Sequence, residues 1–379
     1  MAPATPIPLS RPSYDEREIS RIQAALRGRT AGDGPFGQRV ERRLQAQLGV
    51  ARVLLTTSCT HALELALMAL GLSHGQEVIV PSFTFVSTAN AVLRAGARLV
   101  LADIEEETLG LDPADVEERL TPRTAALLPV HYAGIAAQMG PLLEIAARRG
   151  LKMVEDAAQG VGASWRGRAL GALGDAGCLS FHDTKNLSCG EGGALAFQDE
   201  QAARRAEIIR EKGTNRSAFL RGEVDKYTWV AEGSSYVLSD VLAAILDAQL
   251  DKQWELVVRR GAIAARYRQE LSEWAGSRGV RLCPEPQERV LNHHIFYLRL
   301  PDPIAQQRCL ESLKARGIGA AFHYVPLHSS PFGRSLGLAG GRFSASERVA
   351  ATLVRLPMHA ELSDPDVERV IDAVRDSLD

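Results

Sequence analysis

The 379-residue sequence has few cysteines, little net charge and no long apolar run. Its five cysteines are odd in number and never form a CxxC pair, which argues against a disulfide framework and a zinc site. The net charge of −2, without any basic run, argues against nucleic-acid binding. No apolar run approaches the roughly 18 residues of a membrane span, and no signal-peptide pattern opens the chain. We therefore expect a cytoplasmic protein without a metal site.

Short apolar runs alternate with helical patterns between residues 50 and 200. Runs of this kind fit strands buried on both faces, and their alternation with helices predicts an α/β architecture with a mainly parallel sheet. Several of the runs end in a polar residue. Because open α/β sheets bind ligands beyond the carboxyl ends of their strands, we expect the site there. The expected strands are 52–55, 77–80, 98–103, 125–131, 152–155 and 177–181, and the polar endings are Asp103, His131, Asp156 and His182.

The second half of the sequence predicts a helix over 201–212, a polar loop over 213–229 and further helices over 238–270. The loop mixes aromatic and basic residues. This composition favours a loop that covers a ligand, rather than one that only extends into solvent. Beyond it we expect strands near 294–300 and 319–324, with helices near 304–316 and 363–378. The chain would then divide into a large domain, residues 1–250 with the N-terminal segment, and a smaller C-terminal α/β domain, residues 251–379.

One segment carries the chemistry of the chain. Ser180-Phe-His-Asp-Thr-Lys-Asn186 places Lys185 among small polar residues, and Asp156 ends an apolar run upstream. A lysine amine forms a Schiff base with an aldehyde, which is how pyridoxal phosphate (PLP) enzymes hold their cofactor, and a carboxylate keeps the pyridine nitrogen protonated. Taken singly, Lys185 could be a surface lysine and Asp156 an ordinary strand ending. Together, in this local sequence, they predict PLP chemistry.

Three further segments are more specific than any short glycine motif. They are Ile209-Arg-Glu-Lys-Gly-Thr-Asn-Arg216, Val224-Asp-Lys-Tyr-Thr-Trp229 and Gly233-Ser-Ser-Tyr236. With these, the chain resembles the DegT/StrS family of sugar-nucleotide aminotransferases nearly end to end, and within it the dTDP-4-amino-4,6-dideoxygalactose transaminases. The resemblance implies the type I, aspartate aminotransferase-like fold of PLP-dependent transferases, with helices on both faces of the sheet. It also implies a homodimer with shared active sites.

The resemblance further implies which side chains bind the cofactor. Lys185 would form the Schiff base and move the proton during amino transfer, Asp156 would pair with the pyridine nitrogen, and Gln159 would bond the phenolic oxygen. Without the resemblance, Gln159 could be a polar helix start. The other implied contacts are Thr60, His61 and Ser180 at the phosphate, Phe85 stacked on the ring, and Ser235 reaching the phosphate bound by the partner subunit. Alternatively, Thr60 could act as a helix cap and Phe85 could be a core residue.

One departure from the family concerns the substrate. Many relatives carry Tyr-Asn-x-Arg where this chain has Ser234-Ser-Tyr-Val237, so no arginine follows Ser235. Contact with the substrate's phosphates must then come from other residues, for which basic side chains are chemically apt. Each basic candidate could equally be a solvated charge. The candidates are Lys212, Arg216, Lys226, His323 and Tyr324.

The function that the resemblance implies is transamination of a nucleotide-linked keto sugar. Glutamate would convert PLP to pyridoxamine phosphate (PMP), which would aminate C4 of dTDP-4-keto-6-deoxyglucose to give dTDP-4-amino-4,6-dideoxygalactose. Alternatives are a C3 or 4-ketopentose sugar-nucleotide aminotransferase of natural-product biosynthesis, and a non-catalytic PLP-fold binding or regulatory protein. A related C3 dehydratase would have histidine in place of Lys185. A nicotinamide-dependent oxidoreductase is disfavoured because no GxGxxG follows the first expected strand.

Overall fold

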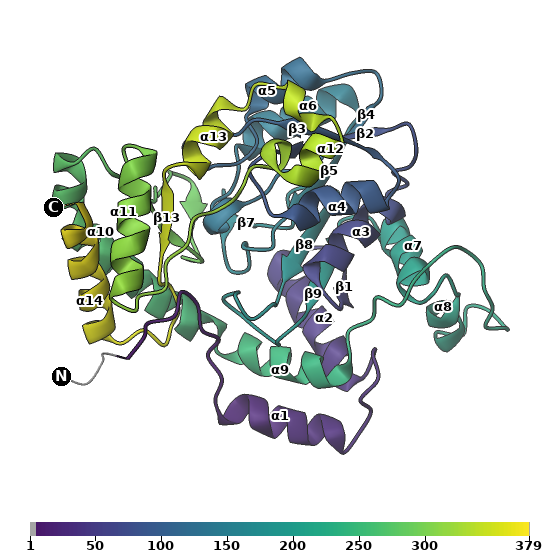
Figure 1. The fold of residues 1–379 in the computed structure, drawn as a ribbon. Coiled ribbons are helices and arrows are strands. Elements are labelled where there is room, and N and C mark those ends of the chain that lie inside the picture. The colour runs from purple at the N-terminus through teal and green to yellow at the C-terminus, as the bar shows by residue number, and fades with distance from the viewer. Residues whose placement is uncertain (1–4, 379) are drawn as a thin grey trace.

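A seven-stranded sheet forms the centre of the larger part of the molecule in the computed structural model, which describes residues 5–378 (Figure 1). The strand order is β1-β9-β8-β5-β4-β2-β3. β9 is antiparallel to both neighbours, and the other pairs, from β8 to β3, are parallel. The predicted mainly parallel sheet is therefore confirmed. The strands are β1 Arg52–Thr56, β2 Glu77–Pro81, β3 Arg98–Ala102, β4 Thr124–Leu127, β5 Lys152–Asp156, β8 Ala176–Ser180 and β9 Gly193–Phe197.

The strands are apolar because both faces of the sheet are covered. Successive side chains on a strand point to opposite faces, and accordingly Leu54 and Leu55 pack in different hydrophobic cores, as do Val78 and Ile79. α3, α4 and α7 cover one face, and α2, α5, α6 and α9 cover the other. These helices are α2 Pro35–Leu48, α3 Cys59–Ala69, α4 Val86–Arg94, α5 Pro113–Arg119, α6 Met139–Arg149, α7 Glu200–Arg210 and α9 Asp240–Asp251, with α1 Glu16–Leu26 packed on α9.

A second core forms around a three-stranded antiparallel sheet of order β10-β12-β13. Near the start of the described chain, Ile7 pairs with Ile318 and packs in this core, whereas the prediction placed the N-terminal segment with the large domain. The expected division after residue 250 falls near the end of α9 and stays a prediction. The elements here are β10 Arg281–Leu282, β12 Phe296–Arg299, β13 Leu353–Leu356, α10 Gln253–Ser277, α11 Pro303–Ala315 and α14 Asp364–Arg375.

Smaller elements connect these two parts. A further sheet has the order β11-β6-β7, and α8 lies in the projecting polar loop at the right of Figure 1. Within residues 5–378, no helix combines the length and apolar character of a membrane span. The remaining short elements are β6 Ser164–Trp165, β7 Arg168–Ala169, β11 Arg289–Val290, η1 Tyr132–Gly134, η2 Leu327–Ser329, η3 Leu338–Gly340, η4 Asp376–Leu378, α8 Arg216–Leu220, α12 Pro331–Ser335 and α13 Ser344–Ala350.

Two expected strands differ from the structure. The strand expected over 125–131 ends at Leu127, shortly before Pro129, which has no N–H to donate to a ladder. The strand expected over 319–324 is absent from the described ladders and reduces to a single bridge between Ala321 and Arg355. The rest of that segment leaves the sheet and carries His323 and Tyr324 into a cavity.

Candidate active site

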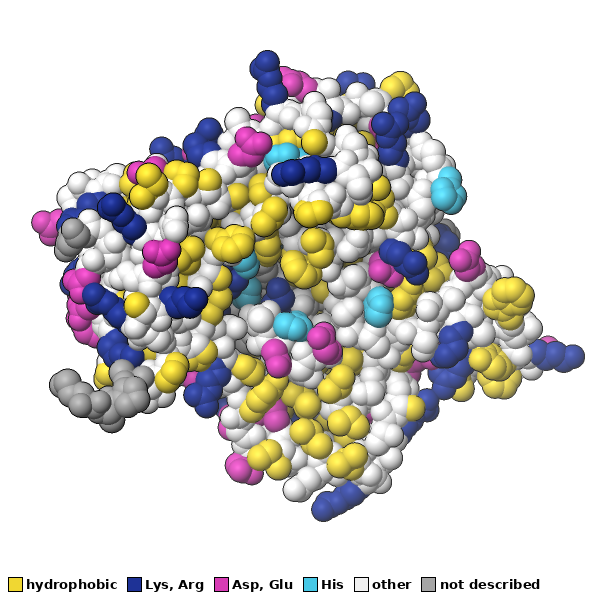
Figure 2. Space-filling view, viewed as in Figure 1, with side chains coloured by type: hydrophobic (Ala, Val, Ile, Leu, Met, Phe, Trp, Pro, Cys, Tyr) yellow, Lys and Arg dark blue, Asp and Glu magenta, His cyan; other side chains and the backbone are white. Residues whose placement is uncertain are grey.

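A cavity of about 520 Å³ lies where β5 and β8 end, between the large sheet and the C-terminal part of the chain. Its volume is in the range of cofactor and small-molecule sites. The face seen in Figure 2 is hollowed near its centre, with histidine and basic side chains inside the hollow. Among the predicted residues, those that line the cavity are Thr60, Phe85, Asp156, Gln159, Ser180, Lys185, His323 and Tyr324.

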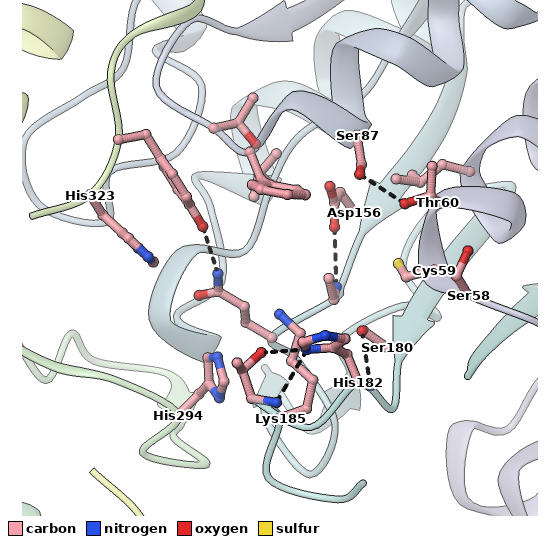
Figure 3. A pocket seen from close by; sticks show the side chains of 18 of the residues that line it. Ser58, Cys59, Thr60, Ser87, Asp156, Ser180, His182, Lys185, His294 and His323 are labelled. Carbon is pink, nitrogen blue, oxygen red and sulfur yellow. Dashed lines mark hydrogen bonds between the residues drawn. The ribbon is translucent and has the colours of Figure 1, made fainter. Parts of the chain in front are cut away.

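Lys185 lies in the turn that follows β8 and projects into the cavity (Figure 3). Its backbone N–H donates to the carbonyl of His182 at 2.8 Å, which holds the turn. Burial lowers the pKa of the Lys185 amine, and the Arg355 cation lowers it further. A lowered pKa increases the neutral, nucleophilic fraction of the amine, as Schiff-base formation requires.

Asp156, the last residue of β5, presents a buried carboxylate to the same cavity and is 6% exposed. Thr88 Oγ1 donates to its Oδ2 at 2.8 Å, and the Ala158 N–H donates to Oδ1 at 3.2 Å. Burial nevertheless raises the pKa of Asp156. In the described part of the chain this carboxylate makes no ion pair. Its surroundings thus fit a ligand that brings a cationic nitrogen, such as a protonated pyridine.

Gln159 is oriented by the backbone. Its Oε1 accepts a hydrogen bond from the Ala133 N–H at 2.6 Å, so its Nε2 faces the hydroxyl of Tyr324 at 3.3 Å. Because both residues line the cavity, Gln159 offers a donor to an oxygen bound there, as the resemblance implies. Phe85 also lines the cavity and is 56% exposed, so it is not a core residue. An exposed aromatic face beside Asp156 fits a planar ring.

The opposite end of the cavity suits an anion. α3 begins at Cys59, and the N-terminal N–H groups of a helix bind phosphates readily. The hydroxyls of Ser58, Thr60 and Ser180 surround this helix start. A Cβ on Gly193 would lie 2.4 Å from the Ser58 carbonyl carbon, so only glycine lets β9 pass this close to the turn. The Asp156 carboxylate, the Lys185 amine, the Phe85 ring and the anion site at the start of α3 together fit PLP.

Other predicted residues lie outside the lining of this cavity. The His61 ring packs on Tyr236, with the centroids 4.8 Å apart, so its side chain contributes no contact to the cavity in this chain. Its predicted place in the phosphate-binding turn at the start of α3 stays a prediction. Four further residues belong to the polar loop over 213–229 or to the segments that flank it, and none of them lines the cavity of its own chain. They are Lys212, Arg216, Lys226 and Ser235.

Two of the polar residues that follow the strands have structural roles and do not line the cavity. Asp103 accepts hydrogen bonds from the backbone of Ala345 and Ser346 and thereby caps α13. His131 Nε2 lies 2.9 Å from Oε2 of Glu155, and both side chains are fully buried. The expectation that all four strand endings mark the site holds for Asp156 and His182, and is wrong for these two.

Several cavity residues were not predicted from the sequence. His294 precedes β12 and lies 2.9 Å from Asn186 Oδ1 through its Nδ1. Thr88 of α4 lies behind the cavity lining and binds Asp156. Burial lowers the pKa of His294 well below the ordinary range, so its imidazole is neutral. Arg355 comes from β13, far along the chain. No local pattern marks these residues, because only the tertiary fold brings them to Lys185.

Comparison with known proteins identifies the family. Residues 12–375 match the model of the DegT/DnrJ/EryC1/StrS aminotransferase family. The chain belongs to this family. Its fold is similar to that of the aminotransferase TlmJ from Streptoalloteichus hindustanus, at 34% identity over 99% of both chains with a TM-score of 0.90. DesV from S. venezuelae is 34% identical over 98% of both chains, with a TM-score of 0.88.

A third similar structure bears on the cofactor. Spr1654 from Streptococcus pneumoniae, assigned to the sugar aminotransferases, has been solved in PLP and PMP forms. The PLP form is 25% identical over 98% of both chains, with a TM-score of 0.91. The predicted family, type I fold, aminotransferase activity and PLP cofactor are confirmed. The roles of individual residues stay predictions.

Proposed function

We propose that this aminotransferase aminates C4 of dTDP-4-keto-6-deoxyglucose, with glutamate as amino donor, to give dTDP-4-amino-4,6-dideoxygalactose. It would work in the cytoplasm as a homodimer with shared active sites. The observation that carries the proposed chemistry is that Lys185 and Asp156 line one cavity with an anion site. The choice of sugar is supported by the segments 209–216, 224–229 and 233–236, which resemble the corresponding transaminases.

Each of the cavity residues would have a different role in amino transfer. PLP, when bound, supplies the electron sink for the carbanion. Asp156 would hold the proton on the pyridine nitrogen, and Gln159 would orient the ring through its phenolic oxygen. The Lys185 amine would carry the proton between the donor's Cα or the sugar's C4 and the cofactor. Phe85 and Tyr324 would bound the space in which both substrates react in turn.

The three segments form one projecting unit, which supports the shared-site proposal. Bridges join Glu211 to Ser235 and Thr214 to Trp229, so the ends of the loop are held together. The loop projects from the body of the molecule in Figure 1, and Trp229 at its return is 76% exposed. A loop turned away from its own cavity, with exposed aromatic residues, suits contact with a second copy of the chain.

Among the basic loop residues, Lys226 is the best candidate for the substrate's diphosphate. Arg216 lies 3.1 Å from Glu211, and Lys212 lies 3.4 Å from the same carboxylate, so acidic neighbours offset both charges. Lys226 is exposed, and within the described chain only its backbone carbonyl has a hydrogen-bond partner, Asn215. Its ammonium is therefore free to meet a phosphate.

The test is a product assay. The purified PLP-loaded protein is incubated with glutamate and dTDP-4-keto-6-deoxyglucose, and the product is assigned by NMR. We expect an amine at C4 with galacto configuration, together with 2-oxoglutarate. A faster reaction with a C3-keto sugar or a 4-ketopentose would replace the substrate assignment by the corresponding alternative. No turnover of any keto sugar would support a non-catalytic binding protein.

A further inference from the structure

Arg355 is a cation in the cavity without an acidic partner. It lies on β13, where its backbone N–H donates to the Ala321 carbonyl at 2.8 Å, and its side chain lines the same cavity as Lys185. Within residues 5–378 it makes no ion pair, and its Nε is buried without a hydrogen-bond partner. By contrast, Arg299 on the neighbouring strand β12 lies 3.1 Å from Glu106. A partly buried guanidinium is costly unless an anion accompanies it.

A neutral histidine orients this guanidinium. Arg355 Nη1 lies 2.5 Å from Nε2 of His323, which is labelled in Figure 3. Burial and Arg355 lower the pKa of His323 to about 2, so the imidazole is neutral and its Nε2 accepts. The proton is then on Nδ1, 3.2 Å from the hydroxyl of Tyr132. This arrangement positions Arg355 without neutralising it.

The acidic side chains that line the cavity are not available to Arg355. Asp156 is required opposite the pyridine nitrogen, and Glu191 lies 3.6 Å from His182 with an exposed side chain. The anion site at the start of α3 suits the cofactor phosphate. An anion beside Arg355 must therefore arrive with a substrate.

We propose that Arg355 binds the α-carboxylate of the amino donor, an α-amino acid. The α-carboxylate is one bond from the carbon whose proton Lys185 moves, so its receptor must lie in the same enclosed space as Lys185. The diphosphate of a nucleotide sugar is several bonds away from the reacting carbon and reaches further out. A planar guanidinium also matches a carboxylate with two parallel hydrogen bonds. The inference rests on the aminotransferase activity and is independent of which sugar is aminated.

The test uses the donor half-reaction, in which no sugar is present. PLP-loaded wild type and Arg355→Gln are mixed with glutamate, with its 1-amide or with its 5-amide, glutamine, and conversion of PLP to PMP is followed by absorbance. We expect the second-order rate for glutamate to fall roughly tenfold to a hundredfold in the variant. The wild-type preference for glutamate over its 1-amide should largely disappear, whereas the preference over glutamine should persist. Arg281→Gln, an exposed arginine on β10 paired with Glu106, is the matched control and should match wild type.

A binding measurement without turnover gives a second readout. Glutarate carries two carboxylates and no amine, and its dissociation constant is obtained by calorimetry with each PLP-loaded protein. Arg355→Gln should bind glutarate at least tenfold more weakly, with Arg355→Lys in between. Unchanged discrimination against the 1-amide, or loss of discrimination against glutamine instead, would overturn the assignment. An increased KM for the nucleotide sugar with an unchanged rate for glutamate would also overturn it.

Discussion

The hydroxyl of Thr88 lies 2.8 Å from Oδ2 of Asp156 and donates a hydrogen bond to it. Thr88 is itself 2.9 Å from the hydroxyl of Thr84. Because the Thr88 hydroxyl donates its proton to the carboxylate, the hydroxyl of Thr84 must be the donor in the contact between the two threonines. A buried chain of hydroxyls on and before α4 thus fixes the orientation of the carboxylate at the end of β5.

The first prediction concerns this hydrogen bond. Replacing Thr88 with valine keeps the shape of the side chain but removes the donor, which favours the neutral form of Asp156 and weakens its hold on the pyridine nitrogen. We expect the dissociation constant of PLP to rise about fivefold, which corresponds to roughly 1 kcal/mol for one hydrogen bond. Equilibrium dialysis measures it. Thr88→Ser retains the hydroxyl and should bind like wild type. Equal PLP affinity in the valine variant would contradict the proposed role.

The second prediction concerns pH. Burial raises the pKa of Asp156 above the ordinary value of 3.8, so its contribution to stability is full below that value and is lost as pH rises through the folded pKa. Cofactor-free Asp156→Asn should therefore be more stable than wild type at pH 8, with the gap closing toward pH 4. PLP should bind this variant roughly tenfold to a hundredfold more weakly, because a charged partner is lost. Urea unfolding without cofactor checks the stability. A wild type more stable than the variant at pH 8 would refute the argument.

The third prediction tests the shared site. Ser235 is exposed in its own chain and, by resemblance, reaches the phosphate bound by a partner subunit. Ser235→Ala should weaken PLP retention by about 1 kcal/mol, whereas Ser234→Ala serves as the neighbouring control. Mixing Ser235→Ala with Lys185→Ala should yield heterodimers with one wild-type site. Sedimentation together with activity of the mixture measures this, and a fully active monomer would rule out sharing.

The fourth prediction concerns the diphosphate. Lys226→Gln should raise the KM for the nucleotide sugar about threefold to tenfold, because an exposed ammonium that contacts phosphate contributes roughly 1 kcal/mol. The KM for glutamate should change little, since glutamate carries no diphosphate. Steady-state kinetics with each substrate varied in turn makes the comparison. Lys314→Gln, on α11, is the control. Equal effects on both substrates would indicate general distortion of the loop instead.

The sequence predicts six of the seven strands of the large sheet because they are buried on both faces and lack alternation, but it does not predict β9. It also predicts Lys185 and Asp156, since each lies in an informative local segment. What local sequence does not reveal is strand order: β5 and β8 are neighbours in the sheet, and this places the two residues in one cavity. Local sequence does not reveal Arg355 or Thr88 for the same reason: only the tertiary fold brings Arg355 from β13 to the cavity and Thr88 from α4 to Asp156. For His61 the structure adds that its ring packs on Tyr236, and its contact with the cofactor phosphate stays a prediction.

The measurement that tests the central claim most directly is the location of the cofactor linkage. The protein is reconstituted with PLP, reduced with borohydride, digested and mapped by mass spectrometry. The account predicts a yellow protein before reduction and the added cofactor mass on Lys185, in the peptide that contains Ser180 and Asn186. Modification of another lysine, or of none after reconstitution, would contradict it.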